Sequence, residues 1–180
     1  EKRNPLAEPL SRYWISREEI EGKLRDRWNH MWLLGWRDIT NATNERTTIA
    51  MVMPRVGVGN NMPLLISQFH RDPKRLSALL ANLCSLSFDF VARHKVGGTH
   101  LNFFIVRQLP VLPPSSYDQS DLEFIAPRVL ELTYTSESLI PWAKDLGYTG
   151  PPFSWDPERR AQLRAELDAY YAKLYSLTRD

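Results

Sequence analysis

The chain of 180 residues has little of several features that mark whole classes of protein. Its single cysteine, Cys84, cannot form an internal disulfide, which favours a reducing compartment, and we expect a cytoplasmic protein. No apolar run approaches the ~18 residues that a membrane span needs, and the opening EKRNPLAEP has no apolar signal core. With 43% hydrophobic and 24% charged residues, the composition is typical of a globular domain with one core.

The sequence also lacks a recognisable active site. GVGNNM, which begins at Gly57, starts like a dinucleotide-binding loop but has no third glycine, and no phosphate loop ending in Gly-Lys-Ser/Thr occurs. Cys84 and His94 lie ~15 Å apart along one expected helix, too far for a nucleophile and its base. We therefore expect no catalytic residue and no cofactor in this chain. Nor does any metal-ligand spacing relate the histidines, which are His30, His70, His94 and His100.

Short apolar and aromatic stretches between turn signals predict strands. They lie near 31–39, 47–54, 62–67 and 103–112. A leucine-rich helix over 73–94 needs a sheet to cover its apolar face. The expected fold class is α+β, a small mixed sheet packed on a long leucine-rich helix and followed by a C-terminal helical segment.

The same pattern suggests three segments. Residues 1–30 form an N-terminal lead-in and helix, residues 31–114 an α/β core, and residues 115–180 a helical segment. Within the last of these, a helix over 156–174 is expected to pack Leu163, Leu167 and Tyr170 on the segment 121–145.

Capping residues mark where helices begin and end. Ser16 and Glu19 have the spacing of a capping box. Asp72-Pro73 and Asp156-Pro157 each place a cap before a proline that can start a helix, and Gly97-Gly98 ends the leucine-rich helix. That helix is expected to bury one face, made of Leu76, Leu79, Leu80, Leu83, Leu86, Phe90 and Val91.

Charge is unevenly distributed, although the net charge is only +2. Residues 71–110 hold six Lys or Arg against two Asp or Glu, whereas residues 111–180 hold seven against eleven. The middle of the chain can therefore face an anion, and the acidic residues of the last helix should point away from it. Ordinary surface charge explains the same counts without any ligand.

Polar and basic residues beside the predicted turns are the best binding candidates. Arg and Lys suit phosphates, while Asn and His can also contact base edges. Cations at a helix C-terminus are favoured by the helix dipole as well, so the run from Arg93 to Lys95 has an equally good explanation without nucleic acid. The candidates are Arg46, Arg55, Asn60, Asn61, Arg93, His94, Lys95, Thr99, His100 and Asn102.

Several segments, taken in order, resemble a module of DNA modification enzymes. KVGGTHLNFFIVRQLPVLPP is similar to the end of their target recognition domains, where a long helix leads into a small-residue turn and a short LPV-PP strand. WLLGWRDITNATNERTTIAMVMPRVGVGNNMPLL looks like the preceding part, and LEFIAPRVLELTYTSESLIPWAKDLGY and RRAQLRAELDAYYAKLYSLTRD look like the following part. The likeness covers roughly residues 13–180 and includes type I restriction specificity subunits and restriction-modification proteins that fuse an adenine-N6 methyltransferase to such a domain.

The resemblance implies sequence-specific binding of double-stranded DNA without catalysis in this chain. The family's Asn-Pro-Pro-Tyr-type catalytic motif and its glycine-rich S-adenosylmethionine motif are absent. We therefore expect a C-terminal portion of a larger enzyme, whose methyltransferase domain binds S-adenosylmethionine and contacts this chain. Two alternatives stay open: a protein-interaction or scaffold role inside the same enzyme, and an unrelated enzyme whose site the sequence does not reveal.

Overall fold

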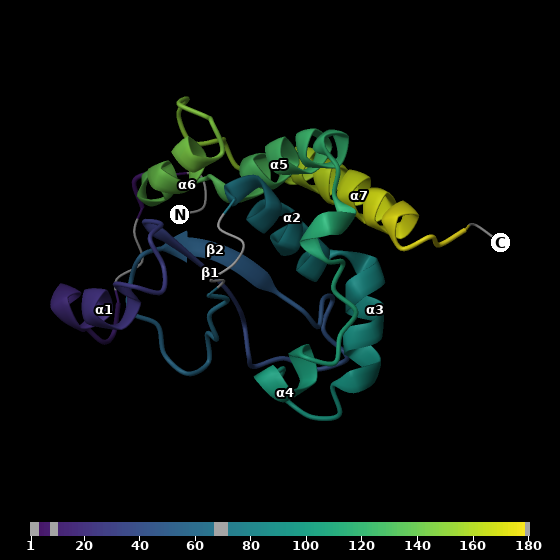
Figure 1. Ribbon diagram of the computed structural model, residues 1–180, viewed down its shortest axis with the longest axis horizontal. Coiled ribbons are helices and arrows are strands. Elements are labelled where there is room, and N and C mark those ends of the chain that lie inside the picture. The colour runs from purple at the N-terminus through teal and green to yellow at the C-terminus, as the bar shows by residue number, and fades with distance from the viewer. Residues whose placement is uncertain (1–3, 8–10, 67–71, 179–180) are drawn as a thin grey trace.

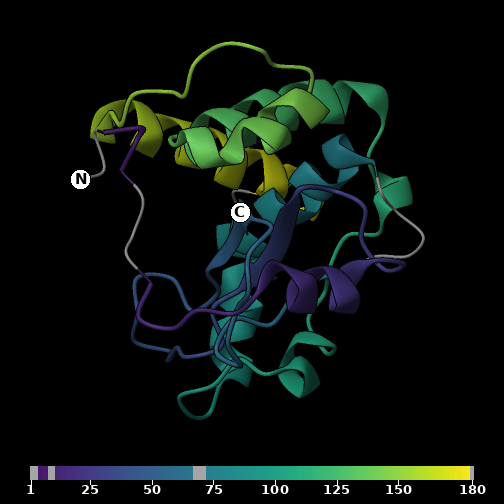
Figure 2. The same cartoon turned by 90° about the vertical axis from the view of Figure 1, so that its left-hand side faces the viewer.

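The computed structural model describes residues 4–7, 11–66 and 72–178 and has the predicted α+β class. Figure 1 shows α5, α6 and α7 along one side of the molecule, with α2 between them and the strands and α4 at the opposite end; Figure 2 shows the same layers after a quarter turn. In chain order the elements are α1 (Arg17–Leu24), β1 (Trp32–Trp36), β2 (Ala50–Pro54), α2 (Pro73–Cys84), α3 (Leu86–Lys95), α4 (Phe103–Val106), η1 (Pro114–Ser116), α5 (Gln119–Thr133), η2 (Glu137–Leu139), α6 (Ile140–Asp145) and α7 (Pro157–Leu174).

The sheet of the described residues consists of β1 and β2, which pair antiparallel with Trp32 opposite Pro54 and Trp36 opposite Ala50. It is therefore not the mixed sheet that we expected. All five residues of β1 are buried, in agreement with its unbroken run of apolar residues. The strand expected from residue 47 begins only at Ala50.

The third expected strand, over 62–67, is reduced to one bridge beside β1. The amide of Leu65 donates to the carbonyl of Leu34 at 2.8 Å, and Gly35 pairs with Leu64. Gly35 permits this close approach, because a Cβ atom at that position would lie only 2.5 Å from the carbonyl oxygen of Pro63. The last residue of the expected strand lies outside the described residues.

The fourth expected strand, over 103–112, is wrong. The segment begins with a helical turn, α4, because the Asn102 side chain accepts a hydrogen bond from the amide of Ile105 at 3.2 Å. Aromatic and β-branched residues favour strands only where another strand can pair with them, and here a local cap decides instead.

The leucine-rich helix is two helices, α2 and α3, bent by 55° at Ser85. Ser85 has an extended backbone, and its hydroxyl accepts a hydrogen bond from the amide of Phe88, so it caps a new helix. The bend turns Leu86 and Phe90 outward, where both are exposed, and the single buried face that we predicted ends at Leu83. Cys84 and the histidine expected on the same helix consequently lie on different helices.

The C-terminal helix α7 begins as predicted. Asp156 accepts hydrogen bonds from the amides of Glu158 and Arg159, and Pro157 occupies the first turn. The helix packs on α5 and α3, and its buried side chains are Leu163, Leu167 and Tyr171, while Tyr170 is half-buried.

One acidic residue of α7 points in a direction that we did not predict. Glu166 stays within the C-terminal segment, where it pairs with Arg128 at 2.7 Å. Asp168 instead reaches the basic middle of the chain, accepting 2.8 Å hydrogen bonds from Arg46 and from the amide of Leu86. That amide is at the start of α3, where free N–H groups attract a carboxylate.

Asp145, at the end of α6, joins the C-terminal segment to β1. Its Oδ2 accepts a hydrogen bond from Trp32 Nε1 at 2.8 Å and lies 2.7 Å from His30 Nδ1. The ring of Trp142 packs edge-on against Trp32, with 4.5 Å between ring centroids. One apolar cluster contains residues from all three segments of the predicted division.

Replacing Leu163 by Ala should lower the free energy of unfolding by about 2–5 kcal/mol, because this fully buried side chain (0% exposed) would leave a cavity under α7. Gln162→Ala, at the exposed neighbouring position, should change it by less than about 0.5 kcal/mol. Urea denaturation followed by tryptophan fluorescence measures both values. Equal effects of the two substitutions would contradict the packing of α7 on the core.

Candidate nucleic-acid interface

The binding candidates fall in two turns and beside two helices. We call residues 57–62, which contain Asn60 and Asn61, the asparagine loop, and residues 97–102, which contain Thr99, His100 and Asn102, the histidine loop. Both follow elements of the core, β2 and α3 respectively, and both are largely exposed.

The backbone that continues β1 holds these two loops side by side. The amide of Asp38 donates to the carbonyl of Asn61 at 3.0 Å, and the carbonyl of Asp38 accepts from the amide of Leu101 at 2.7 Å. Two residues on, the amide of Thr40 donates to the carbonyl of Thr99 at 2.9 Å. The asparagine loop and the histidine loop are therefore fastened to one extended segment, although they are distant in sequence.

A hollow of about 470 Å³ opens between the two loops. Asn60 and Asn102 both line it, one from each loop. Lys23 and Arg27, from α1 and the turn after it, add two exposed cations to its lining. Sequence reasoning missed these two, although their spacing of four residues in KLRDR places both on one side of a helical turn.

Arg55 has a structural role. Its Nε and Nη2 donate 2.9 Å hydrogen bonds to the two carboxylate oxygens of Glu21, and its Nη1 donates to the carbonyls of Trp28 and His30. The side chain is only 5% exposed. The paired guanidinium also holds the pKa of Glu21 below its ordinary value. Arg55 therefore connects α1 to the end of β2, and its guanidinium group is occupied by these partners.

Arg46 and Arg93 also have partners inside the chain. Arg46 is paired with the carboxylate of Asp168. Arg93 donates hydrogen bonds to the carbonyls of Ala42 and Glu45 and, at 2.9 Å, to the buried carboxylate of Asp89. The guanidinium of Arg93 thus holds the turn after residue 40 against α3, whether or not it also contacts a ligand.

The smaller polar candidates remain more accessible. His94 is exposed, with its ring against Phe90 and its Nδ1 2.7 Å from the Phe90 carbonyl. His100 Nδ1 lies 2.6 Å from a carboxylate oxygen of Asp38, while half of its side chain faces solvent. Of the ten binding candidates, four are exposed and form no side-chain hydrogen bond with another described residue, and these are Asn60, Asn61, Lys95 and Thr99.

The chemistry available at this surface is binding. Asn and His side chains offer donors and acceptors, and Lys and Arg offer cations. Cys84 lies elsewhere, and burial raises the pKa of its thiol to about 11, which keeps it protonated. Among the described residues, no group of three or more His, Cys, Asp or Glu side chains could hold a metal ion.

Comparison with known proteins finds no match: no protein-family model, no curated protein and no solved structure is significantly similar to this chain. Among the described residues, no single helix is long and apolar enough to cross a membrane; α2 and α3 reach that length and composition only as a pair bent by 55°.

Replacing Arg93 by Ala should lower the free energy of unfolding by about 1–3 kcal/mol, because it leaves two carbonyls and Oδ2 of the buried Asp89 without their donor. Lys95→Ala removes the same charge two residues away and should change stability by less than about 0.5 kcal/mol. Chemical denaturation of the two variants compares them directly. Similar stabilities would show that Arg93 is as dispensable to the fold as Lys95.

Proposed function

We propose that this chain is the non-catalytic target recognition domain of an adenine-N6 DNA methyltransferase of the restriction-modification or phage-defence type. It binds double-stranded DNA and selects the sequence to be methylated. Catalysis and S-adenosylmethionine binding belong to a methyltransferase domain outside this chain, with which the chain forms one clamp on the duplex. The observation that carries the proposal is the joining of the asparagine and histidine loops along one backbone segment.

This arrangement suits the two tasks of a DNA-reading surface. Lys23, Arg27 and Lys95 are exposed cations that can neutralise phosphates and set the position of the duplex. Asn60 and Asn102 face one hollow between the loops, and amide side chains can form paired hydrogen bonds with the edge of adenine. A methyltransferase must also extrude its target base, so a second domain has to hold the duplex from the other side.

His100 adds a further hydrogen-bonding group. When Nδ1 donates a hydrogen bond to Asp38, Nε2 is left as an acceptor, and half of the side chain faces solvent. His100 can therefore contact a base edge with Nε2 while Asp38 keeps the ring in place.

The position of the acidic segment supports the same orientation. Residues 111–180 carry the excess of acidic side chains, and their helices α5, α6 and α7 lie on the opposite side of the molecule from α4 and the histidine loop that precedes it (Figure 1). DNA approaching the loops therefore avoids most of the acidic surface.

The alternative is a protein-interaction or scaffold role, and exposed aromatic residues favour it. Phe103 and Phe104, at the start of α4, are 49% and 75% exposed and line a shallow hollow with Arg107 and Gln108. Exposed aromatic residues beside an arginine are typical of protein contacts. In this alternative the surface packs against another domain of the same enzyme.

Duplex binding distinguishes the two roles. The chain should bind a 20-base-pair duplex weakly, in the range of ~10⁻⁴–10⁻⁶ M at physiological salt, because half of the clamp is missing. The double variant Lys23→Ala/Lys95→Ala should weaken binding and reduce the salt slope by about 0.9 for each lost phosphate contact. Fluorescence anisotropy across a salt series measures both quantities.

The matched control is Lys144→Ala/Lys173→Ala, which removes the same charge from α6 and α7. It should leave affinity nearly unchanged. An equal loss of affinity in both double variants would show that net charge alone explains the effect. Binding that is absent or independent of salt would favour the scaffold role.

Sequence choice should depend on Asn102. Asn102→Ser keeps a side-chain oxygen that can cap α4 but removes the amide, so the fold is retained and a base contact is lost. In the methyltransferase that contains this chain, discrimination at one position of the target should fall by about 1–3 kcal/mol. Methylation of a randomised duplex library measures it, and an unchanged target would exclude Asn102 from base recognition.

A further inference from the structure

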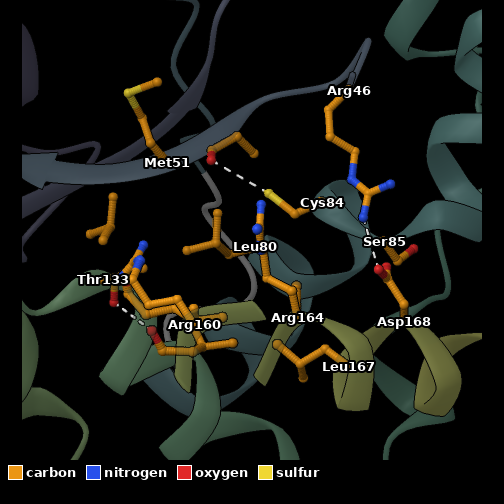
Figure 3. A pocket seen from close by; sticks show the side chains of 15 residues that line it. Arg46, Met51, Leu80, Cys84, Ser85, Thr133, Arg160, Arg164, Leu167 and Asp168 are labelled. Carbon is orange, nitrogen blue, oxygen red and sulfur yellow. Dashed lines mark hydrogen bonds and ion pairs between the residues drawn. The ribbon is translucent and has the colours of Figure 1, made fainter. Parts of the chain in front are cut away.

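A second cavity lies on the other side of the core, between β2, α2, α5 and α7 (Figure 3). Its volume is about 330 Å³, room for about ten non-hydrogen atoms at ~30 Å³ each. The walls are mostly aliphatic, with Val52 from β2, Leu80 from α2, Val129 and Leu132 from α5, and Leu167 from α7. It shares no lining residue with the hollow between the asparagine and histidine loops.

Three arginines surround this apolar space, and their charges are unequally compensated. Arg46, on one wall, is neutralised by Asp168 at 2.8 Å. Arg160 and Arg164 lie four residues apart on α7 and both line the cavity. Within the described residues, the carboxylate that Arg164 meets is that of Glu45, at 3.7 Å, and both side chains of this pair are mostly exposed.

Among the described residues, Arg160 has a hydrogen-bond partner and a ring partner but no ion-pair partner. Its Nη1 donates a 2.8 Å hydrogen bond to the carbonyl of Leu132, and its guanidinium lies 3.7 Å from the ring centroid of Trp155. Burial lowers its pKa, and the nearby charge of Arg164 lowers it further. Two like charges one turn apart on a helix repel each other, so an anion between them would remove a destabilising interaction.

We propose that this cavity binds an amphipathic oxyanion, a carboxylate or phosphate monoester carried on an apolar body, with about ten non-hydrogen atoms in all. The oxyanion lies between the guanidinium groups of Arg160 and Arg164, which suit planar, paired hydrogen bonds to such groups. The apolar body fills the space between α2 and α5. This site goes beyond the proposed recognition of DNA and does not depend on it.

Because of the position of this site, a bound ligand would affect the stability of the fold. α7 contributes both arginines, while β2 and α2 contribute the opposite wall, so the ligand contacts the C-terminal helix and the core together. A ligand that binds only the folded state raises stability with its concentration. Bound ligand therefore strengthens the attachment of α7 to the core.

Isothermal titration calorimetry with the full chain tests the proposal. The probes are octanoate and octyl phosphate, with octanol and inorganic phosphate as controls that each lack one half of the ligand. At least one amphipathic anion should bind with a Kd on the order of 10⁻⁴ M. Octanol and inorganic phosphate should bind about tenfold more weakly or not at all. The stronger of the two anions identifies the headgroup.

The decisive variant is Arg164→Gln, because this side chain is 55% exposed and has only a long contact with Glu45, so the fold does not depend on it. It should weaken binding by about tenfold or more, as expected for the loss of a charge-assisted hydrogen bond. Lys173→Gln removes one charge from α7 outside the cavity and should bind as the unsubstituted chain does. A thermal melt confirms that both variants are folded.

Three results would overturn the site. The first is that neither amphipathic anion binds. The second is that octanol binds as tightly as the anions, and the third is that Arg164→Gln and Lys173→Gln change binding equally. Each of these results is independent of DNA binding, because no residue substituted in the DNA-binding tests lines this cavity.

Discussion

The candidate interface depends on the backbone hydrogen bonds of the segment that extends β1. On one side the amides of Trp36 and Asp38 donate to Pro63 and Asn61, and on the other Asp38 and Thr40 bond to the histidine loop. The indole of Trp36 reinforces this side by donating to the carbonyl of Leu101 at 2.6 Å. An interior strand satisfies its backbone groups on both edges, so two loops of irregular structure gain the rigidity of a sheet without being strands. A recognition surface needs this rigidity, because polar contacts give selectivity only when their geometry is maintained.

Charge distribution proved to be a poor guide to which cations face solvent. Arg46, Arg55 and Arg93 all belong to the basic or turn-flanking residues that suggested phosphate contacts. In the structure each is paired with a carboxylate, on Asp168, Glu21 and Asp89 respectively. An arginine has five donors in a planar fork, so it readily joins backbone carbonyls and carboxylates from separate segments. Lys23 and Lys95 remain accessible, and so does Arg27.

The bend at Ser85 organises both halves of the molecule. It directs α3 toward the histidine loop and leaves the N-terminal amides of α3 facing α7, where Asp168 accepts the hydrogen bond of Leu86. Asp168 also orients Arg46, which lines the cavity of the second proposed site. One serine cap therefore influences the positions of two surfaces. A straight helix with a continuous leucine face would have covered more of the sheet. It would have had no free amide at Leu86 to donate to Asp168.

The sequence alone determined the features that depend on residues within about one helical turn of each other. The caps at Ser16, Asp72 and Asp156 were predictable because the donor and acceptor are two or three positions apart. The pairing of the two loops and the reduction of the third strand to one bridge were decided by tertiary structure. So were the carboxylate partners of the arginines and the recruitment of Lys23 and Arg27 to the hollow. These features depend on partners far away in the chain. Local propensity carries no information about which distant group will complete a hydrogen bond or neutralise a charge.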